Sequence, residues 1–271
     1  MQIKHIFLSD VDGTLLRGDS GIHRKVIKAA HEYVNAGGFL NLCTGRAPIS
    51  SRWVARELPV NMPCILYTGA AIYDFETEQC IWSQHFSNDI LPIIEKLYME
   101  YPNISIQAYT QDNIFMLRAN ERLLSRGIKQ EIPDCISALS DVKGNLLKLV
   151  LTCDDVNLLQ QCGKQLFSSD EMTFAFSSTH FAEVVPAGTG KDNAMRTLSE
   201  LYDIPLSRFF AAGDGMTDLP MIELSSYSFA PVTAPKLILD KCDMIIPSCE
   251  EGGMETAFNY ARDVIRGGLS D

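Results

Sequence analysis

The sequence lacks the cysteine spacings that are typical of a zinc site. Its 8 cysteines include no CxxC pair and no combination with histidine at a zinc-binding spacing, and several of them lie inside apolar runs. The pattern therefore favours reduced cysteines that are packed in a hydrophobic core.

Basic residues are in the minority, and long apolar runs are missing. The chain has 23 Lys and Arg against 34 Asp and Glu, a formal charge of -11, which disfavours attraction to nucleic acid or to an anionic membrane. No apolar run reaches the ~18 residues of a membrane span, and no secretory signal pattern is evident at the N-terminus. We therefore expect no nucleic-acid partner, no membrane partner and a cytoplasmic location.

The 271 residues alternate between strand and helix patterns in two separate regions, 1–82 and 183–271. Such alternation is typical of an α/β fold in which helices cover a parallel sheet, and here the expected strands include residues 64–67 and 182–185. Residues 83–182 differ, because they contain paired strand patterns with interspersed helices. We predict a discontinuous core domain, 1–82 and 183–271, with an inserted α/β (α+β) domain at 83–182.

Polar residues follow several of the predicted core strands at the point where each strand ends. Asp10 and Asp12 follow the first strand, residues 44–46 (Thr-Gly-Arg) follow "FLNLC", and Asp214 and Asp218 follow "FFAAG". The carboxyl ends of parallel strands meet at one rim of the sheet, which is where ligands bind in such folds. We therefore expect these side chains to lie close together.

The aspartates on this rim indicate a divalent cation. So many carboxylates in one cleft repel one another unless a cation lies among them or some of them are protonated. Ligand sets made of oxygen alone favour Mg²⁺. Thr44 and Lys191 add donors that suit a phosphoryl oxygen, and Lys191 begins a predicted helix, whose N-terminus favours an anion.

Four motifs, "DVDGT", "LCTGR", "GTGKDNA" and "GDGMTD", resemble the haloacid dehalogenase superfamily of aspartate-nucleophile phosphatases, specifically its Cof-type subfamily. They occur in the family's order, with an insertion of the family's size between the second and the third. The resemblance covers the whole chain. It implies a Rossmann-like, doubly wound parallel sheet as the core and an α/β cap domain that determines substrate specificity.

The resemblance also implies a role for each carboxylate. Asp10 would be the nucleophile that forms an aspartyl-phosphate, and Asp12 would be the general acid and base. Pump-type relatives carry threonine at the position of Asp12, so aspartate here favours hydrolysis. Mg²⁺ would be held by Asp10, by the main-chain carbonyl of Asp12 and by Asp214, with Asp218 binding it directly or orienting one of its waters.

By the same resemblance, a second group of residues would bind the phosphate. Thr44, with Gly45 beside it, would hydrogen-bond a phosphoryl oxygen, and Lys191 would neutralise the charge on the transferred group. Thr217 stands where relatives often have asparagine, and residues 68–70 (Thr-Gly-Ala) stand where "NGA" is common. Thr217 could therefore contact the phosphate through its shorter hydroxyl, or it could cap the following helix.

The function expected from these observations is Mg²⁺-dependent hydrolysis of a small phosphomonoester, with sugar or polyol phosphates as the family's usual substrates. Two alternatives stay open: a phosphomutase of sugar phosphates, and a protein that binds a phosphorylated ligand without catalysis. Arg118 and His180 are candidate substrate contacts in the inserted domain, although a surface role suits each of them equally.

Overall fold

The computed structural model describes residues 5–16, 21–87, 90–168 and 170–267. The chain divides into two compact units. The first unit consists of the residues up to Gln79 and those from Gly190 onward, and the second runs from Cys80 to Thr189.

The first unit is built on a five-stranded sheet in the order β13-β12-β11-β1-β2, and every neighbouring pair in it is parallel. Its strands are short and largely buried: β1 (Ile6–Ser9), β2 (Phe39–Leu42), β11 (Phe209–Ala212), β12 (Tyr227–Pro231) and β13 (Met244–Ile246). In β1, the first strand of the chain, Ile6 and Leu8 point to the face opposite Phe7, and none of the three has exposed surface. Both faces of the sheet are therefore covered.

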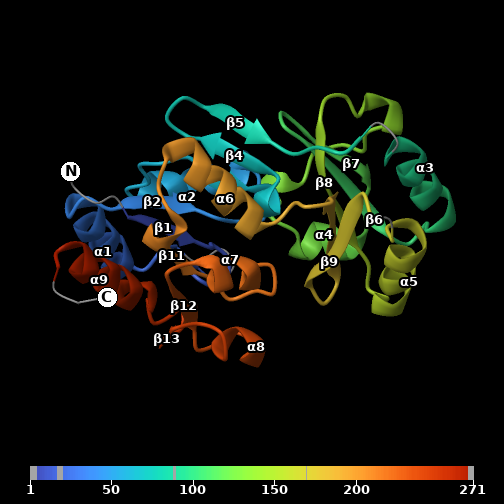
Figure 1. The fold of residues 1–271 in the computed structure, drawn as a ribbon. Helices are drawn as coiled ribbons and strands as arrows, with labels where there is room; N and C mark the ends of the chain where they lie inside the picture. The colour runs from blue at the N-terminus through green and yellow to red at the C-terminus, as the bar shows by residue number, and fades with distance from the viewer. Residues whose placement is uncertain (1–4, 17–20, 88–89, 169, 268–271) are drawn as a thin grey trace. The chain divides into compact units, whose positions relative to one another are not determined.

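Helices flank this sheet (Figure 1): α1 (Arg24–Asn35), α2 (Pro48–Glu57), α6 (Lys191–Tyr202), α7 (Leu219–Leu224), α8 (Lys236–Leu239) and α9 (Met254–Ile265). A short 3-10 helix, η4 (Leu206–Arg208), precedes β11. On one face Phe7 packs against Tyr33 of α1 and Phe258 of α9, with ring centroids 5.9 and 4.8 Å away. The parallel α/β core predicted from the sequence is confirmed.

The expected strand at residues 64–67 belongs to a different sheet. β3 (Cys64–Leu66) pairs antiparallel with β4 (Ala71–Asp74), and the three-stranded sheet has the order β3-β4-β5, with β5 at Gln79–Ser83. One isolated parallel bridge, between Cys43 and Ile65, links β3 to the end of β2. The 3-10 helix η1 (Tyr67–Gly69) reverses the direction of the chain, so that β4, which follows it, pairs antiparallel with β3.

The second unit is an antiparallel sheet in the order β7-β6-β8-β10-β9 with helices packed on it. Its strands are β6 (Ser105–Thr110), β7 (Ile114–Arg118), β8 (Leu146–Thr152), β9 (Met172–Ser178) and β10 (Phe181–Pro186). Its helices are α3 (Ile90–Glu100), α4 (Glu121–Arg126) and α5 (Val156–Leu166), with 3-10 turns η2 (Lys129–Glu131) and η3 (Leu139–Asp141). Buried Ile94, Leu149 and Leu159 share its hydrophobic core.

The strand expected at residues 182–185 lies in this second unit and not in the parallel core. β10 pairs antiparallel with both β8 and β9, and its Ala182 and Val184 belong to the core of the second unit. The second unit therefore extends to Thr189, whereas the sequence analysis placed the boundary after Ala182. An apolar strand pattern does not say which sheet the strand joins, because that depends on the neighbour it finds.

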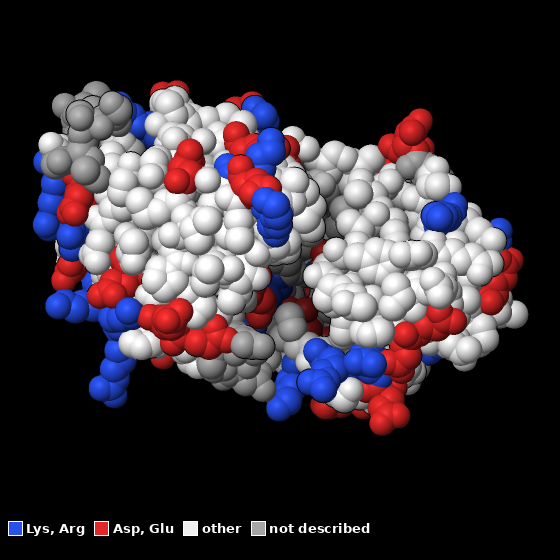
Figure 2. All heavy atoms as spheres, turned by 90° about the horizontal axis from the view of Figure 1, so that it is seen from below, with Lys and Arg blue, Asp and Glu red and all other residues white. Residues whose placement is uncertain are grey.

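Lys and Arg are interspersed with Asp and Glu on the face of the molecule that Figure 2 shows. None of the helices that the structure describes is both long enough and apolar enough to cross a bilayer.

Candidate active site

Asp10 directly follows β1, where its backbone N–H extends the sheet by donating to the Ala212 carbonyl, 2.9 Å away. The residue is buried, with 6% of its surface exposed. Lys191, the first residue of α6, donates from Nζ to Asp10 Oδ1 over 2.8 Å. The ends of β1 and α6, far apart in the sequence, thus place a carboxylate and an ammonium in contact.

Asp218 is the second partner of Lys191, whose Nζ donates to Asp218 Oδ1 over 2.5 Å. The other carboxylate oxygen, Oδ2, accepts the backbone N–H groups of Asp214 and Gly215 at 3.1 and 2.8 Å. Both oxygens of Asp218 are therefore engaged by the protein. This arrangement fixes Lys191 and the loop after β11 to each other.

Asp214 is held by the stretch that follows Asp12. Thr14 donates its hydroxyl to Asp214 Oδ1 over 3.0 Å. Gly13 has a φ of +87°, and a Cβ on it would lie 2.2 Å from Asp214 Oδ2. Glycine is needed here both for the backbone conformation and for the close approach. The sequence analysis gave no role to Gly13 or Thr14, although both belong to the "DVDGT" motif.

The charges of these groups shift the pKa values of their neighbours. Burial raises the pKa of Asp10 well above its usual value, and the charge of Asp218 adds to this, while Lys191 opposes it. Burial and the charge of Asp218 raise the pKa of Asp214 to about 6. For Lys191, burial lowers the pKa, but the charges of Asp10 and Asp218 outweigh it and shift the pKa upward.

The residues fit a magnesium ion. Asp10, Asp214 and Asp218 each offer a carboxylate oxygen, and these oxygens lie within 4.8 Å of one another. Asp12 is a fourth carboxylate near the site, and the two cations in contact with the group, Lys191 and Arg46, leave two negative charges uncompensated. Hard oxygen ligands with that excess charge match Mg²⁺.

Asp12 and Thr44 are linked through Arg46. The Arg46 guanidinium donates to both carboxylate oxygens of Asp12, at 2.7 and 2.6 Å. Its backbone N–H donates to Thr44 Oγ1 over 3.2 Å, with Gly45 between them in the bend after β2. Because Thr44 Oγ1 accepts this bond, its own hydrogen remains for another acceptor.

The segment around Thr68 has an unusual backbone. Tyr67 and Thr68 have φ values of +54° and +59°, a region that β-branched residues rarely adopt. The Thr68 N–H donates to the Thr44 carbonyl over 3.1 Å. A Cβ on Gly69 would lie 2.3 Å from the Gly190 carbonyl oxygen, so this turn packs directly against the start of α6. The turn therefore supports both Thr44 and Lys191.

Thr217 lies in the loop between β11 and α7, half-buried and next to Asp218. The N-cap of α7 is Asp218, one residue after Thr217. Thr217 precedes the cap and shares its loop with the backbone N–H groups that bind Asp218.

The two candidate substrate contacts of the second unit have other partners. Arg118 donates to the carbonyls of Tyr98 and Tyr101, at 2.5 and 2.9 Å, and stacks on the Tyr98 ring. His180 lies in the turn between β9 and β10, with Nδ1 3.2 Å from the Cys153 carbonyl oxygen. Both contacts hold the second unit together, so they favour a structural role for these residues.

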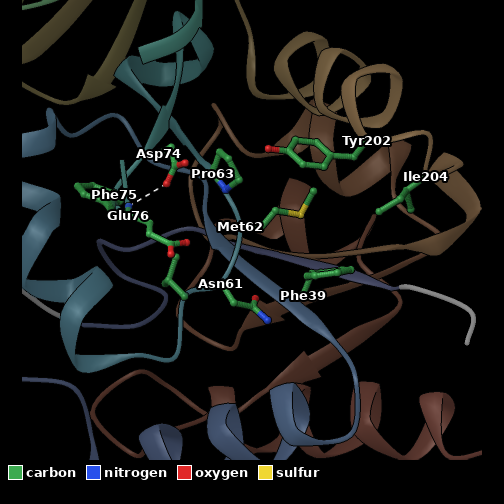
Figure 3. A pocket seen from close by; sticks show the side chains of 10 residues that line it. Phe39, Asn61, Met62, Pro63, Asp74, Phe75, Glu76, Tyr202 and Ile204 are labelled. Atoms are coloured by element: carbon green, nitrogen blue, oxygen red, sulfur yellow. Dashed lines mark hydrogen bonds between the residues drawn. The ribbon is translucent and has the colours of Figure 1, made fainter. Parts of the chain in front are cut away.

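A pocket of about 370 Å³ lies in the first unit (Figure 3). It is lined by Phe39, the first residue of β2, by Met62, which precedes β3, and by Tyr202, the last residue of α6. Thr44 lies beyond the other end of β2, and Lys191 is at the other end of α6, so the pocket is at the opposite edge of the core from the carboxylates. The pocket is therefore separate from the candidate active site.

Comparison with known proteins identifies the class of enzyme. Residues 7–258 match the family model of the haloacid dehalogenase-like hydrolases, so the chain belongs to that family, in its Cof-type branch. It is accordingly a phosphatase. The family predicted from the four motifs is confirmed.

Individual relatives agree with this family over nearly their whole length. The chain is 26% identical to the 5-amino-6-(5-phospho-D-ribitylamino)uracil phosphatase YwtE of Bacillus subtilis, over 90% of this chain and 93% of that protein. It is 26% identical to an HMP-PP phosphatase of Yersinia pseudotuberculosis, over 90% of each. A solved haloacid dehalogenase-like hydrolase from Bacteroides thetaiotaomicron has the same fold, with a TM-score of 0.84, 21% identity and coverage of 94% of this chain and 98% of that one.

Proposed function

We propose that this phosphatase hydrolyses small phosphomonoesters with the help of Mg²⁺, through a phosphorylated Asp10. The observation that carries the proposal is the buried group formed by Asp10, Lys191 and Asp218, with Asp214 beside it. With Mg²⁺ bound to offset the excess negative charge, a lysine held by two buried carboxylates, next to a third, is suited to bind a phosphoryl dianion and to stabilise its transfer.

In the first step, a carboxylate oxygen of Asp10 attacks phosphorus, and the bond from phosphorus to the substrate oxygen breaks. Lys191 is in contact with Oδ1, which leaves Oδ2 as the attacking oxygen. Asp12 gives a proton to the departing oxygen, so that the product is a neutral alcohol. Thr44 donates its free hydroxyl hydrogen to a phosphoryl oxygen, with Lys191 compensating the negative charge.

In the second step, water replaces the alcohol. Asp12, now ionised, takes a proton from the water, whose oxygen attacks the phosphorus of the aspartyl-phosphate. The bond from Asp10 to phosphorus breaks, and inorganic phosphate leaves. The exposed side chain of Asp12, with 47% of its surface accessible, allows it to reach both the alcohol and the water.

Mg²⁺ would be held by the Asp10 and Asp214 carboxylates and by the main-chain carbonyl of Asp12. Asp218 would act on it through water, since both of its own oxygens already accept hydrogen bonds from the protein. When bound, the ion supplies positive charge that keeps Asp10 ionised and screens it from the phosphate. This positive charge would oppose the effect of burial, which raises the pKa of Asp10.

The substrate class follows from the chain's relatives and remains part of the proposal. YwtE and a second relative, YitU of Bacillus subtilis, are named for a substrate whose phosphate is carried on a ribityl chain. We therefore propose a phosphorylated sugar or polyol chain as the substrate, with the second unit as the domain that selects it.

A screen of phosphate release tests the proposal. The panel contains sugar, polyol, nucleotide and cofactor monoesters, each with Mg²⁺ and with EDTA, and Asp10→Asn is the matched control because it is nearly isosteric. We expect Mg²⁺-dependent release from at least one polyol or sugar phosphate, and none from Asp10→Asn.

Two results would contradict the proposal. Sugar-phosphate isomers that form faster than phosphate is released would indicate a phosphomutase. Binding of monoesters without any turnover would indicate a protein that only binds a phosphorylated ligand.

A further inference from the structure

Arg46 is a buried cation whose guanidinium binds the Asp12 carboxylate through two nitrogens. Its exposed surface is 6%, and it donates from Nε to Asp12 Oδ2 and from Nη2 to Asp12 Oδ1, at 2.7 and 2.6 Å. The remaining nitrogen, Nη1, donates to the Ser50 carbonyl in the first turn of α2, 3.2 Å away. The guanidinium is therefore fixed on the protein side while the Asp12 side chain is about half exposed.

The backbone of Arg46 is fixed as well. Its N–H bonds to Thr44 Oγ1 at 3.2 Å, and its carbonyl accepts from the Tyr67 N–H at 3.2 Å. Pro48 starts α2 two residues later. The backbone of Arg46 is thus bonded to Thr44, and its guanidinium is bonded to Asp12. Arg46 therefore fixes the position of Asp12 relative to Thr44.

The geometry of this contact is directional. A guanidinium that bonds both oxygens of a carboxylate sets the plane of that carboxylate, whereas an ammonium at the same place is a point charge that leaves it free to turn. An exposed aspartate without such a partner would populate several rotamers. Arg46 removes that freedom at the one position where the proposed reaction needs a proton delivered along a defined line.

We propose that Arg46 is a positioning residue, which aims the Asp12 carboxylate at the oxygen of the leaving alcohol. The proposal rests on the role of Asp12 as the acid under "Proposed function". Arg46 itself does not touch the transferred phosphoryl group in this mechanism. Its effect must therefore pass through Asp12 and must vanish when Asp12 can no longer act as an acid.

The test is a double-mutant cycle that is measured with two substrates, which differ in their leaving groups. The variants are Arg46→Gln, Asp12→Asn and the double variant, and Arg52→Gln is the matched control because Arg52 lies on α2 and pairs with Glu78 instead. Alcohol release is measured in single turnover from p-nitrophenyl phosphate, which needs little protonation, and from the best alkyl phosphate of the panel. KM is measured alongside the rate.

We expect Arg46→Gln to slow release from the alkyl phosphate at least tenfold and release from p-nitrophenyl phosphate less than threefold. The tenfold loss is part of the ~10²–10⁴-fold that general acid catalysis contributes. We expect the double variant to be no slower than Asp12→Asn, because residues that act as a unit are not additive. KM and the Arg52→Gln control should stay close to the parent. Arg46→Lys, which keeps the charge but not the fork, should resemble Arg46→Gln, and it replaces that variant if Arg46→Gln does not fold.

An equal loss with both substrates would overturn the proposal, as would an additive loss in the double variant, because either would mean that Arg46 acts on the phosphate or on the fold. These failures differ from failure of the proposed function. If Asp12→Asn itself loses the same factor with both leaving groups, Asp12 is not the acid. If Asp12→Asn is selective and Arg46→Gln is not, only the role of Arg46 is wrong.

Discussion

Replacing Gly13 with alanine should weaken Mg²⁺ binding through a contact that the sequence does not reveal. The new Cβ would lie 2.2 Å from Asp214 Oδ2, where real Cβ contacts are not found below 3.0 Å, so the carboxylate must retreat by about 0.8 Å. Mg²⁺ demands near-ideal distances of about 2.0–2.1 Å from its ligands, and a displacement of that size breaks one of them. We expect at least a tenfold weaker Kd, ~1.4 kcal/mol.

The same substitution also strains the backbone, because Gly13 has a φ of +87°. That cost is about 1–2 kcal/mol of folding free energy for a residue with a Cβ. Gly188→Ala isolates it, since Gly188 has a φ of +75° and its nearest neighbour, Gln84 Nε2, would be 3.6 Å from the new Cβ. Both variants should therefore lose similar stability, but only Gly13→Ala should lose metal affinity.

The assay combines titration calorimetry with Mg²⁺ and denaturant unfolding in EDTA for the parent and both variants. If Gly13→Ala binds Mg²⁺ as tightly as the parent, then either Asp214 is not a metal ligand or the close approach does not position it. If Gly188→Ala weakens Mg²⁺ binding equally, the effect is one of general stability and the argument from the contact is refuted.

Four further outcomes follow from the site. Asp10→Asn should lower kcat at least a hundredfold, ~2.7 kcal/mol, without lowering Tm, and a smaller loss would count against covalent catalysis. Mg²⁺ affinity should fall as the pH drops through about 6, because protons compete for the Asp214 carboxylate, whose pKa is raised by burial to about 6 in the metal-free site; calorimetry that finds the same affinity on both sides of that pH contradicts this. Thr68→Asn should raise the unfolding free energy by about 1 kcal/mol, since asparagine tolerates a φ of +59° better than threonine, and an unchanged or lower value in denaturant unfolding would show that the backbone there is not strained. Thr217→Val should lower kcat/KM and leave Tm unchanged, while Thr217→Asn should alter kcat/KM less than tenfold, ~1.4 kcal/mol; a lowered Tm with unchanged kcat/KM in the valine variant would assign Thr217 to the fold instead.

Elements with a strong local pattern could be predicted from the sequence. The helix predicted to begin at Lys191 is present as Lys191–Tyr202, and the parallel core strands beginning with Ile6–Ser9 lie where the apolar runs are. Local spacing also put the aspartates after strand ends, which in a parallel sheet all face one rim. These features depend on residues that are near one another in the chain.

Other features were decided by tertiary structure, because they depend on partners that are distant in sequence. The strand at residues 181–186 is equally apolar whichever sheet it joins, and only its pairing with β8 and β9 assigns it to the second unit. The contact between Lys191 and Asp10 spans 181 positions, and the fork of Arg46 on Asp12 spans 34. A motif can indicate that such residues share a site, but the direction of a carboxylate is set by the donors that the fold brings to it.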